Sequence, residues 1–284
     1  MNFPRIFPVI LLALTACSLA ADNDFPNTLS AEEKAEGWKL LFDGKTVTGL
    51  QGLEKRDFLK EGWEIKKGVL QIPKSVRQSG KVTGGDLVTT EQFNDFEFKF
   101  DFKLAASAIS GVLYFARGGL GQKPTGHEYL LIDDTHHPEG LKGKELYHTS
   151  ALTGVLPPKK GTSVLMAERP DEEEWNEGKI SVVGNHVEHW LNGEKVLEYE
   201  CGSQALKQAV AANKAKVPMT FGSKIKSSLA ILDKGEEIAF RNLKVRAISN
   251  TPQPALAPPP AEPPAPAKTA WKLPPPPPPP VLKP

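Results

Sequence analysis

The sequence predicts an all-β fold in which two antiparallel sheets pack face to face as a sandwich or jelly roll. The clearest observation is the segment 96–104, where Phe or Leu alternates with Glu, Lys or Asp. A strand with one buried face and one wet face requires this alternation. Other short apolar segments are separated by turn-forming pairs such as Asn192-Gly193. Only 204–212 is expected to form a helix.

The first 20 residues read as a secretory signal peptide, with a basic start, an apolar run and then small residues. Two processing sites are open. Leu14-Thr15-Ala16-Cys17 resembles a bacterial lipobox, in which Cys17 is acylated, whereas 18–21 resembles an ordinary cleavage site. Both indicate export. We expect a protein of the bacterial periplasm or cell envelope, lipid-anchored through Cys17 in the preferred interpretation and otherwise secreted.

Composition divides the rest of the chain into three parts. Residues 21–36 are expected to be a linker and 37–249 the folded domain. The segment 250–284 contains 16 of the 26 prolines and is predicted to be a disordered, polyproline-II-like tail. The tail is either a passive spacer or a ligand that contacts envelope components.

Within the domain, strands are expected in chain order. The first is a tight hairpin over 63–72 that turns at Lys67-Gly68. After it the alternating or continuously apolar segments are 96–104, 111–116, 128–132, 179–183, 186–191, 195–199, 229–232 and 238–248.

Charge and cysteine content exclude several classes of protein. The formal net charge is +1, and the part between residues 22 and 250 is slightly acidic, so a nucleic-acid partner is not expected. Only the N-terminus has an uninterrupted apolar stretch, which excludes a polytopic membrane protein. A membrane contact is expected only through the possible lipid anchor. Cys17 and Cys201 are the two cysteines, so no disulfide framework is expected.

Acidic and imidazole side chains cluster around the end of the strand 128–132. Glu128 and Asp134 face the same way but lie about 20 Å apart if the strand stays straight, so they cannot form a tight catalytic pair. Asp133, Asp134, His136 and His137 fall within five residues. They form either a site for a divalent metal ion, the candidate cofactor, or an ordinary polar loop.

Two further segments carry candidate sugar-binding residues. His186 and Trp190 share one strand face, where they form either a sugar-stacking platform or structural residues of an outer sheet face. Arg241 interrupts an apolar strand and could pair with a carboxylate of the site. Trp175-Asn176 is interpreted as a capping or core-packing pair.

The chain resembles the 3-keto-disaccharide hydrolase family over about 37–248. The ordered motifs that carry the resemblance are 37–45 (GWKLLFDGK), 85–91 (GDLVTTE), 110–112 (SGV), 126–129 (GHEY), 133–134 (DD), 137–138 (HP), 174–177 (EWNE), 186–193 (HVEHWLNG) and 240–242 (FRN). The resemblance implies a concanavalin-like jelly roll whose site lies on the concave sheet.

The same resemblance implies activity on 3-keto glycosides. A ketone at C3 acidifies the proton on C2, so a base can remove it while the glycosidic oxygen leaves from C1 and water later adds. We expect Glu128, Asp134 and His137 to be catalytic. Ser110, Trp190 and Arg241 are expected to bind a carbohydrate. Asp133 and His136 are the further candidate metal ligands.

Several polar positions of the family are altered. Ile109 replaces an Asn, Leu113 a Lys and Leu130 a Gln, while Leu232-Asp233-Lys234-Gly235 replaces Gln-Asp-His-Gly and Thr153-Gly154 replaces Tyr-Asp. These changes remove hydrogen-bonding groups for a sugar. Two hypotheses therefore remain: an exported glycosidase-like enzyme, or a non-catalytic carbohydrate-binding or envelope interaction module on the same fold.

Overall fold

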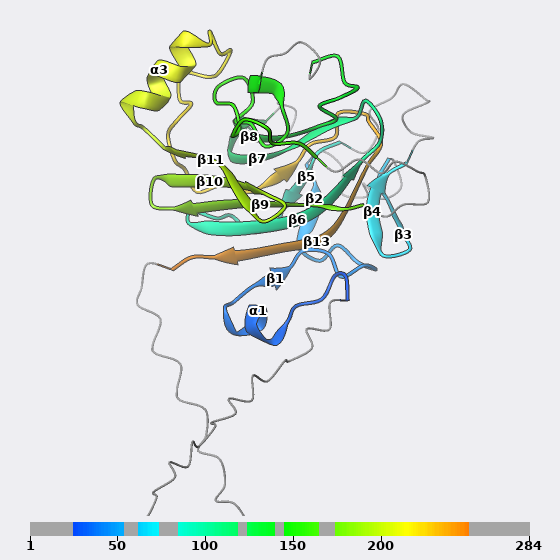
Figure 1. Cartoon of the computed structure of the whole chain (residues 1–284). Coiled ribbons are helices and arrows are strands. Elements are labelled where there is room, and N and C mark those ends of the chain that lie inside the picture. The colour runs from blue at the N-terminus through cyan, green and yellow to red at the C-terminus, as the bar shows by residue number, and fades with distance from the viewer. Residues whose placement is uncertain are drawn as a thin grey trace, which may run out of the picture. The chain divides into compact units, whose positions relative to one another are not determined.

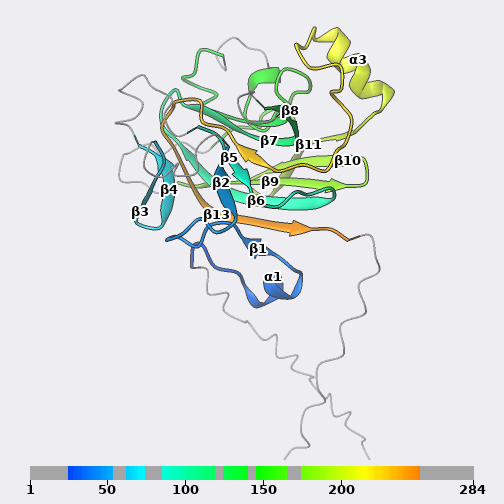
Figure 2. The same cartoon turned by 180° about the vertical axis from the view of Figure 1, so that it is seen from behind.

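The computed structural model describes residues 25–53, 62–73, 85–118, 124–139, 145–164 and 174–249. Two antiparallel sheets stack on one another (Figures 1 and 2), which confirms the predicted two-sheet fold. The predictions for residues 1–20, Cys17 and 250–284 lie outside the described residues. Within the described residues, no helix has the length and apolar character needed to span a membrane.

The large sheet has eight strands in the order β11-β10-β9-β6-β13-β4-β3, and β1 pairs separately with β13. Its last strand in the chain, β13, is therefore internal, with β6 on one side and β4 and β1 on the other. The bounds are β1 Lys39–Leu40, β3 Glu64–Lys66, β4 Val69–Ile72, β6 Phe96–Leu104, β9 Asn176–Val183, β10 His186–Leu191, β11 Glu194–Glu200 and β13 Ile238–Ala247.

The small sheet has five strands in the order β2-β5-β12-β7-β8. Its strands are β2 Leu50–Gly52, β5 Leu87–Thr89, β7 Ile109–Arg117, β8 Thr125–Ile132 and β12 Ala230–Ile231. Three strands of the small sheet (β2, β5 and β12) and two of the large sheet (β1 and β3) have two or three residues. β3 and β12 lie within the predicted segments 63–72 and 229–232, whereas β1, β2 and β5 were not predicted as strands. A segment so short shows no hydrophobic period.

Alternation along the strands builds the core between the sheets. In β6 the residues Phe96, Phe98, Phe100, Phe102 and Leu104 are buried, while the charged residues between them lie on the outer face. The ring of Phe100 meets Tyr129 of the small sheet edge-on, with centroids 5.5 Å apart. Burying each such ring stabilises the fold by about 2–3 kcal/mol.

Two tight hairpins form where turn residues predicted them. Lys67 and Gly68 join β3 to β4 with φ values of 52° and 78°. Asn192 and Gly193 join β10 to β11 with φ values of 49° and 80°. Positive φ at both central positions gives the twist that antiparallel strands need.

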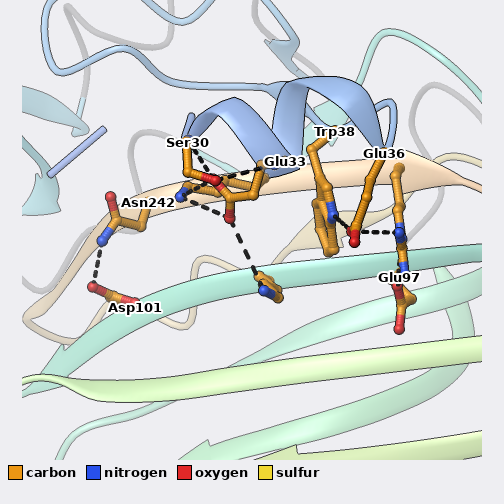
Figure 3. A network of polar contacts seen from close by, with 10 residues as sticks. Ser30, Glu33, Glu36, Trp38, Glu97, Asp101 and Asn242 are labelled. Atoms are coloured by element: carbon orange, nitrogen blue, oxygen red, sulfur yellow. Dashed lines mark hydrogen bonds and ion pairs between the residues drawn. The ribbon is translucent and has the colours of Figure 1, made fainter. Parts of the chain in front are cut away.

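The segment expected to be a linker contains a short helix, α1 (Ala31–Ala35). Ser30 and Glu33 form a reciprocal capping box at its start, a signal readable as Ser-x-x-Glu. The helix lies over the outer face of the large sheet beside β13 (Figure 3). Glu33 pairs there with Lys244 at 2.8 Å, and Glu36 accepts hydrogen bonds from Trp38 and Arg246.

The helix predicted over 204–212 is confirmed as α3 (Gln204–Ala212). The hydroxyl of Ser203 caps it by accepting from the amide of Leu206, whose side chain is buried. A single-turn 3-10 helix, Glu145–Tyr147, precedes the segment that flanks β8. Cys201 is buried, and burial raises the pKa of its thiol to about 11, which makes it unreactive.

A chain of four aromatic side chains crosses the core near α3. His127 Nδ1 lies 2.5 Å from the Tyr199 hydroxyl, which lies 2.8 Å from the Tyr114 hydroxyl, which lies 2.7 Å from His189 Nε2. All four residues are buried. Burial lowers the pKa of His127 to about 3 and that of His189 to about 4, so both imidazoles are neutral.

The ends of this chain fix the direction of every proton in it. The amide of Gly222 donates to His127 Nε2, so the proton of His127 is on Nδ1. At the other end His189 Nδ1 lies 2.8 Å from the carbonyl oxygen of Ser150 and must donate to it, so Nε2 of His189 accepts. Each donor therefore meets one acceptor, and the network is satisfied only with neutral histidines.

Candidate functional site

Glu128 stands on the outer face of the small sheet, the face turned away from the large sheet. Its cross-strand neighbour is Leu113 of β7. The same row of paired residues then crosses the sheet through Ala230 of β12, Val88 of β5 and Gln51 of β2. Residues paired directly across a sheet share a face. The next residues along β7 point the other way, because Val112 and Tyr114 belong to the core between the sheets.

A lysine lies beside Glu128. Lys234, just after β12, places its ammonium 2.5 Å from Glu128 Oε1, and the two side chains are 27% and 17% exposed. Gly111 makes room for this carboxylate, because a Cβ at that position would lie 2.5 Å from Oε1. The ion pair is therefore formed by β7, β8 and the segment after β12, and both side chains keep some exposure to solvent.

The rest of this row is apolar. Val88, Leu113, Ala230 and Leu232 form a small buried cluster separate from the main core. Leu130, two residues beyond Glu128 on β8, is 1% exposed. Glu128 is thus surrounded by leucine side chains at the positions where the sequence departs from the family pattern. These side chains offer a sugar hydroxyl no hydrogen-bond partner.

Asp134 lies in the turn that follows β8. Its Oδ1 accepts from the amide of Thr149 at 2.9 Å, while Oδ2 is buried without a hydrogen-bond partner. Burial raises the pKa of Asp134 to about 6, and the neighbouring Asp133 adds to this, against the Thr149 hydrogen bond and the charge of His148. Perturbed carboxylates of this kind are candidates for proton transfer near neutral pH.

Asp133 is fully buried and its carboxylate is already saturated. Oδ1 accepts from the amide and hydroxyl of Thr135 and from the amide of His136, and Oδ2 accepts from Ser107 and lies 2.8 Å from His136 Nδ1. Burial alone would raise the pKa of Asp133, but these hydrogen bonds lower it to about 2. These contacts occupy both carboxylate oxygens of Asp133. The assignment of Asp133 and His136 as metal ligands stays a prediction.

His137 also lies in the turn after β8. Its amide donates to the carbonyl of Asp133, and its Nδ1 accepts from the amide of Glu139 at 3.1 Å, which leaves Nε2 as its protonated nitrogen. Within the described part of the chain, the hydrogen bonds of Glu128, Asp134 and His137 go to other residues and do not join the three to one another. The catalytic assignment of these three residues stays a prediction.

Three predicted substrate-binding residues do not lie with Glu128. Ser110 is fully buried, and its hydroxyl donates to the carbonyl of Leu232, so it cannot touch a ligand in this conformation. Arg241 belongs to β13 and Trp190 to β10, both in the large sheet. Alternation predicts the strand face that Trp190 shares with His186, but not which sheet holds the strand.

Trp190 lies on the outer face of the large sheet and is engaged there. Its Nε1 donates to Glu188 at 2.9 Å, and the ammonium of Lys179 lies 4.0 Å from the ring centroid. The structural interpretation of this strand face therefore accounts for its contacts.

A different group on that face has the geometry of a metal site. One ligand atom each of His186, Glu188 and Glu198 lies within 4.8 Å of the others. Lys195 already bridges the two carboxylates at 3.0 and 2.7 Å, so a divalent ion would have to displace an ammonium. A register shift between His189 and Trp190 in the β10–β11 hairpin pairs Glu188 with Glu198 and so creates this cluster.

Lys234 is the functional candidate that the sequence did not reveal. The segment 232–235 was noted as altered, yet nothing in it indicates that position 234 would meet β8. The contact depends on β12 pairing with β7, a pairing across more than a hundred residues. His148 was missed for the same reason, since the segment after the 3-10 helix follows the edge of β8.

Comparison with known proteins places the chain among carbohydrate-active relatives. Residues 37–246 match the model of the 3-keto-alpha-glucoside-1,2-lyase-like domain. A 3-keto-disaccharide hydrolase of Bacteroides thetaiotaomicron is 29% identical over 247 residues, covering 78% of this chain and 82% of that protein.

Two crystal structures of candidate glycosyl hydrolases from Parabacteroides distasonis are also similar. One is 31% identical with a TM-score of 0.66 and covers 79% of this chain and all of its own. The other is 23% identical with a TM-score of 0.52, covers 74% of this chain and 99% of its own, and supports the fold alone.

Proposed function

The chain belongs to the family of 3-keto-α-glucoside-1,2-lyase-like domains, and from this membership we propose that it is an exported enzyme that cleaves 3-keto glycosides or related disaccharides. Its relative in Bacteroides thetaiotaomicron is named for that reaction class. The signal-peptide pattern of residues 1–20, with Cys17 as the acylation site, supports export and a lipid anchor.

The observation that carries the proposal is the Glu128–Lys234 pair on the outer face of the small sheet. A carboxylate and an ammonium side by side are the two groups that enolate formation needs. Glu128 removes the C2 proton, and Lys234 stabilises the negative charge that develops on the C3 oxygen.

A single carboxylate can carry out both proton transfers of the elimination. The C2–H and C1–O bonds break, a C1=C2 double bond forms, and the protonated Glu128 returns its proton to the departing glycosidic oxygen. Water then adds its hydroxyl to C1 and a proton to C2. Glu128 to Ile132 spans about 13 Å of strand, so Asp134 and His137 are proposed to contact the more distant sugar unit.

A second candidate function is favoured by the apolar row of Val88, Ala230 and Leu113 beside Glu128. A sheet face with few hydrogen-bonding groups suits a module that binds a ligand or an envelope partner without catalysing its conversion. In that case Glu128 and Lys234 form a structural ion pair.

Turnover of a 3-keto glycoside with a chromogenic leaving group separates the two functions. The wild-type protein should release the leaving group, and Glu128→Gln should lower kcat by about 100-fold or more, the usual contribution of a general base. Glu177→Gln, an exposed carboxylate of the large sheet, is the matched control and should keep full activity.

Absence of turnover by the wild-type protein would contradict the enzymatic proposal. If the protein then still binds the glycoside, and Glu128→Gln binds it equally well, the non-catalytic module is the correct function. Equal loss in Glu128→Gln and Glu177→Gln would also count against Glu128 as the base.

A further inference from the structure

A long groove runs over the outer face of the large sheet, on the opposite side of the sandwich from Glu128. It consists of two cavities of about 750 and 330 Å³ that share Val69, Gln71 and Trp175 in their walls. The larger cavity alone has the volume of an ordinary small-molecule site. We call the joined cavities the Trp175 groove.

The larger end of the groove is held rigidly. Asn27 and Asn242 exchange hydrogen bonds, each backbone amide donating to the other's side-chain oxygen, and Asn27 Nδ2 donates to the carbonyl of Gly68. Asn242 also donates to Asp101 (Figure 3). The N-terminal segment, the β3–β4 turn and β13 are thereby fixed around one cavity.

Arg241 projects into this cavity with part of its hydrogen-bonding capacity unused. Its Nε donates to Asp101 at 3.0 Å, and its guanidinium carbon lies 4.3 Å from the centre of the Trp175 ring. The side chain is only 25% exposed. No described residue pairs with its two terminal nitrogens, and that planar fork matches a carboxylate in two parallel hydrogen bonds.

Three lysines add positive charge at the same end. Lys45, Lys66 and Lys67 line the cavity and are exposed, and none of them has an ion-pair partner within the described chain. The one acidic residue of that lining, Asp43, is turned toward its own loop, where it accepts from the amides of Lys45 and Thr46. The lining therefore attracts anions.

Apolar surface runs between the charged ends. Val69 and Trp175 line both cavities, and Ile238 and Ala239 continue the strip toward the far end, which Lys103 and Glu237 line with one charge of each sign. Indole rings and aliphatic side chains pack against the C–H faces of sugar rings, whereas a free phosphate ion makes no use of them.

We propose that the Trp175 groove binds an acidic saccharide, a chain of sugars that carry carboxylates. Arg241 holds one carboxylate through its terminal nitrogens, the lysines of the β3–β4 turn hold the next, and Trp175 supports a sugar ring. This site is independent of the proposed catalysis at Glu128 and stands whether or not that face turns over a substrate.

Calorimetric titration of the purified full chain with an oligogalacturonate tests the proposal. A neutral cello-oligosaccharide of equal length and inorganic polyphosphate are titrated in parallel. We expect the uronate to bind with an affinity that falls as salt is raised, and the neutral sugar to bind much more weakly.

The variants assign that binding to the groove. Lys66→Gln combined with Lys67→Gln should weaken binding about tenfold, and Arg241→Lys should weaken it similarly although the charge is kept. The control pair Lys207→Gln and Lys216→Gln removes the same charge from an exposed region at α3 and should change nothing. If Arg241→Lys does not fold, the two turn lysines still decide the matter.

Four outcomes would overturn the proposal. They are absence of uronate binding, equal binding of the neutral sugar, polyphosphate binding that equals or exceeds uronate binding, and equal losses in the control pair. A fifth outcome, loss of uronate binding in Glu128→Gln, would also overturn it, because the saccharide would then lie on the small sheet. Failure of turnover at Glu128 with groove binding intact would leave this proposal standing.

Discussion

Acidification is expected to destabilise this fold through the two buried histidines. His127 and His189 fit their network only as neutral imidazoles, with pKa values of about 3 and about 4, against 6.5 in an unfolded chain. Below pH 6.5 these two imidazoles bind protons in the unfolded chain but stay neutral in the folded chain. The folded state therefore loses stability as the pH falls from 6.5, and the loss levels off only below the folded pKa values.

The size of the effect follows from proton linkage. Each histidine contributes about 1.4 kcal/mol per pH unit while only the unfolded chain is protonated. Between pH 7 and pH 5 the pair together should lower the free energy of unfolding by about 4 kcal/mol. Natural domains are stable by about 5–15 kcal/mol, so this loss is a large fraction of the total.

Urea unfolding followed by tryptophan fluorescence, at constant ionic strength and several pH values, measures the loss. The surface histidine His186 provides a control of opposite sign. The hydrogen bond from its ring to Glu200 raises its pKa, so its contribution is present below pH 6.5 and fades as the pH rises through the raised pKa. His186→Gln should make the acid loss steeper. A free energy that stays flat from pH 7 to pH 5, or an imidazole signal showing His189 charged at pH 5, would refute the reasoning.

Four other outcomes are expected. Glu128→Gln and Lys234→Gln should each lower kcat/KM about 100-fold, and the double variant should be little worse than either, because the two groups act as one pair; fully additive losses would argue against this. Gly111→Ala should lower kcat by displacing the carboxylate of Glu128, with the urea midpoint nearly unchanged; unaltered kcat would contradict that contact. A chelator should leave the melting temperature unchanged because Asp133 is saturated by protein donors, and a fall reversed by added metal would show otherwise. Tyr199→Phe should cost about 1–3 kcal/mol of unfolding free energy by leaving buried partners unmatched, and a smaller loss would mean that water replaces the hydroxyl.

Local rules predicted most of the fold. The bounds expected for 96–104, 186–191 and 204–212 are those of β6, β10 and α3. The first and last residues of a strand with one buried face can be predicted, because every second residue between them must be apolar. Turn chemistry did the same for the two hairpins, where only a few residues tolerate the required φ values.

Those local rules could not predict which of the candidate site residues lie close together in the fold. Trp190 shares a strand face with His186, as predicted, yet Trp190 and Arg241 both belong to the sheet opposite Glu128. Lys234 was passed over although it contacts Glu128 directly. Period and turn signals act over a few residues, whereas the pairing of β12 with β7 joins segments far apart in the chain and is decided by the packing of the whole sandwich.

The internal position of β13 determines when the large sheet can finish folding during synthesis of the chain. Residues 238–247 emerge last from the ribosome among the strands, yet they form the bridge between β6 and the β3–β4 hairpin. Until they are present, β1 and the β3–β4 hairpin cannot join the rest of the large sheet, and the edge of β6 that pairs with β13 stays exposed to chaperones or to other chains. A nascent chain stalled anywhere before residue 238 should therefore remain protease-sensitive.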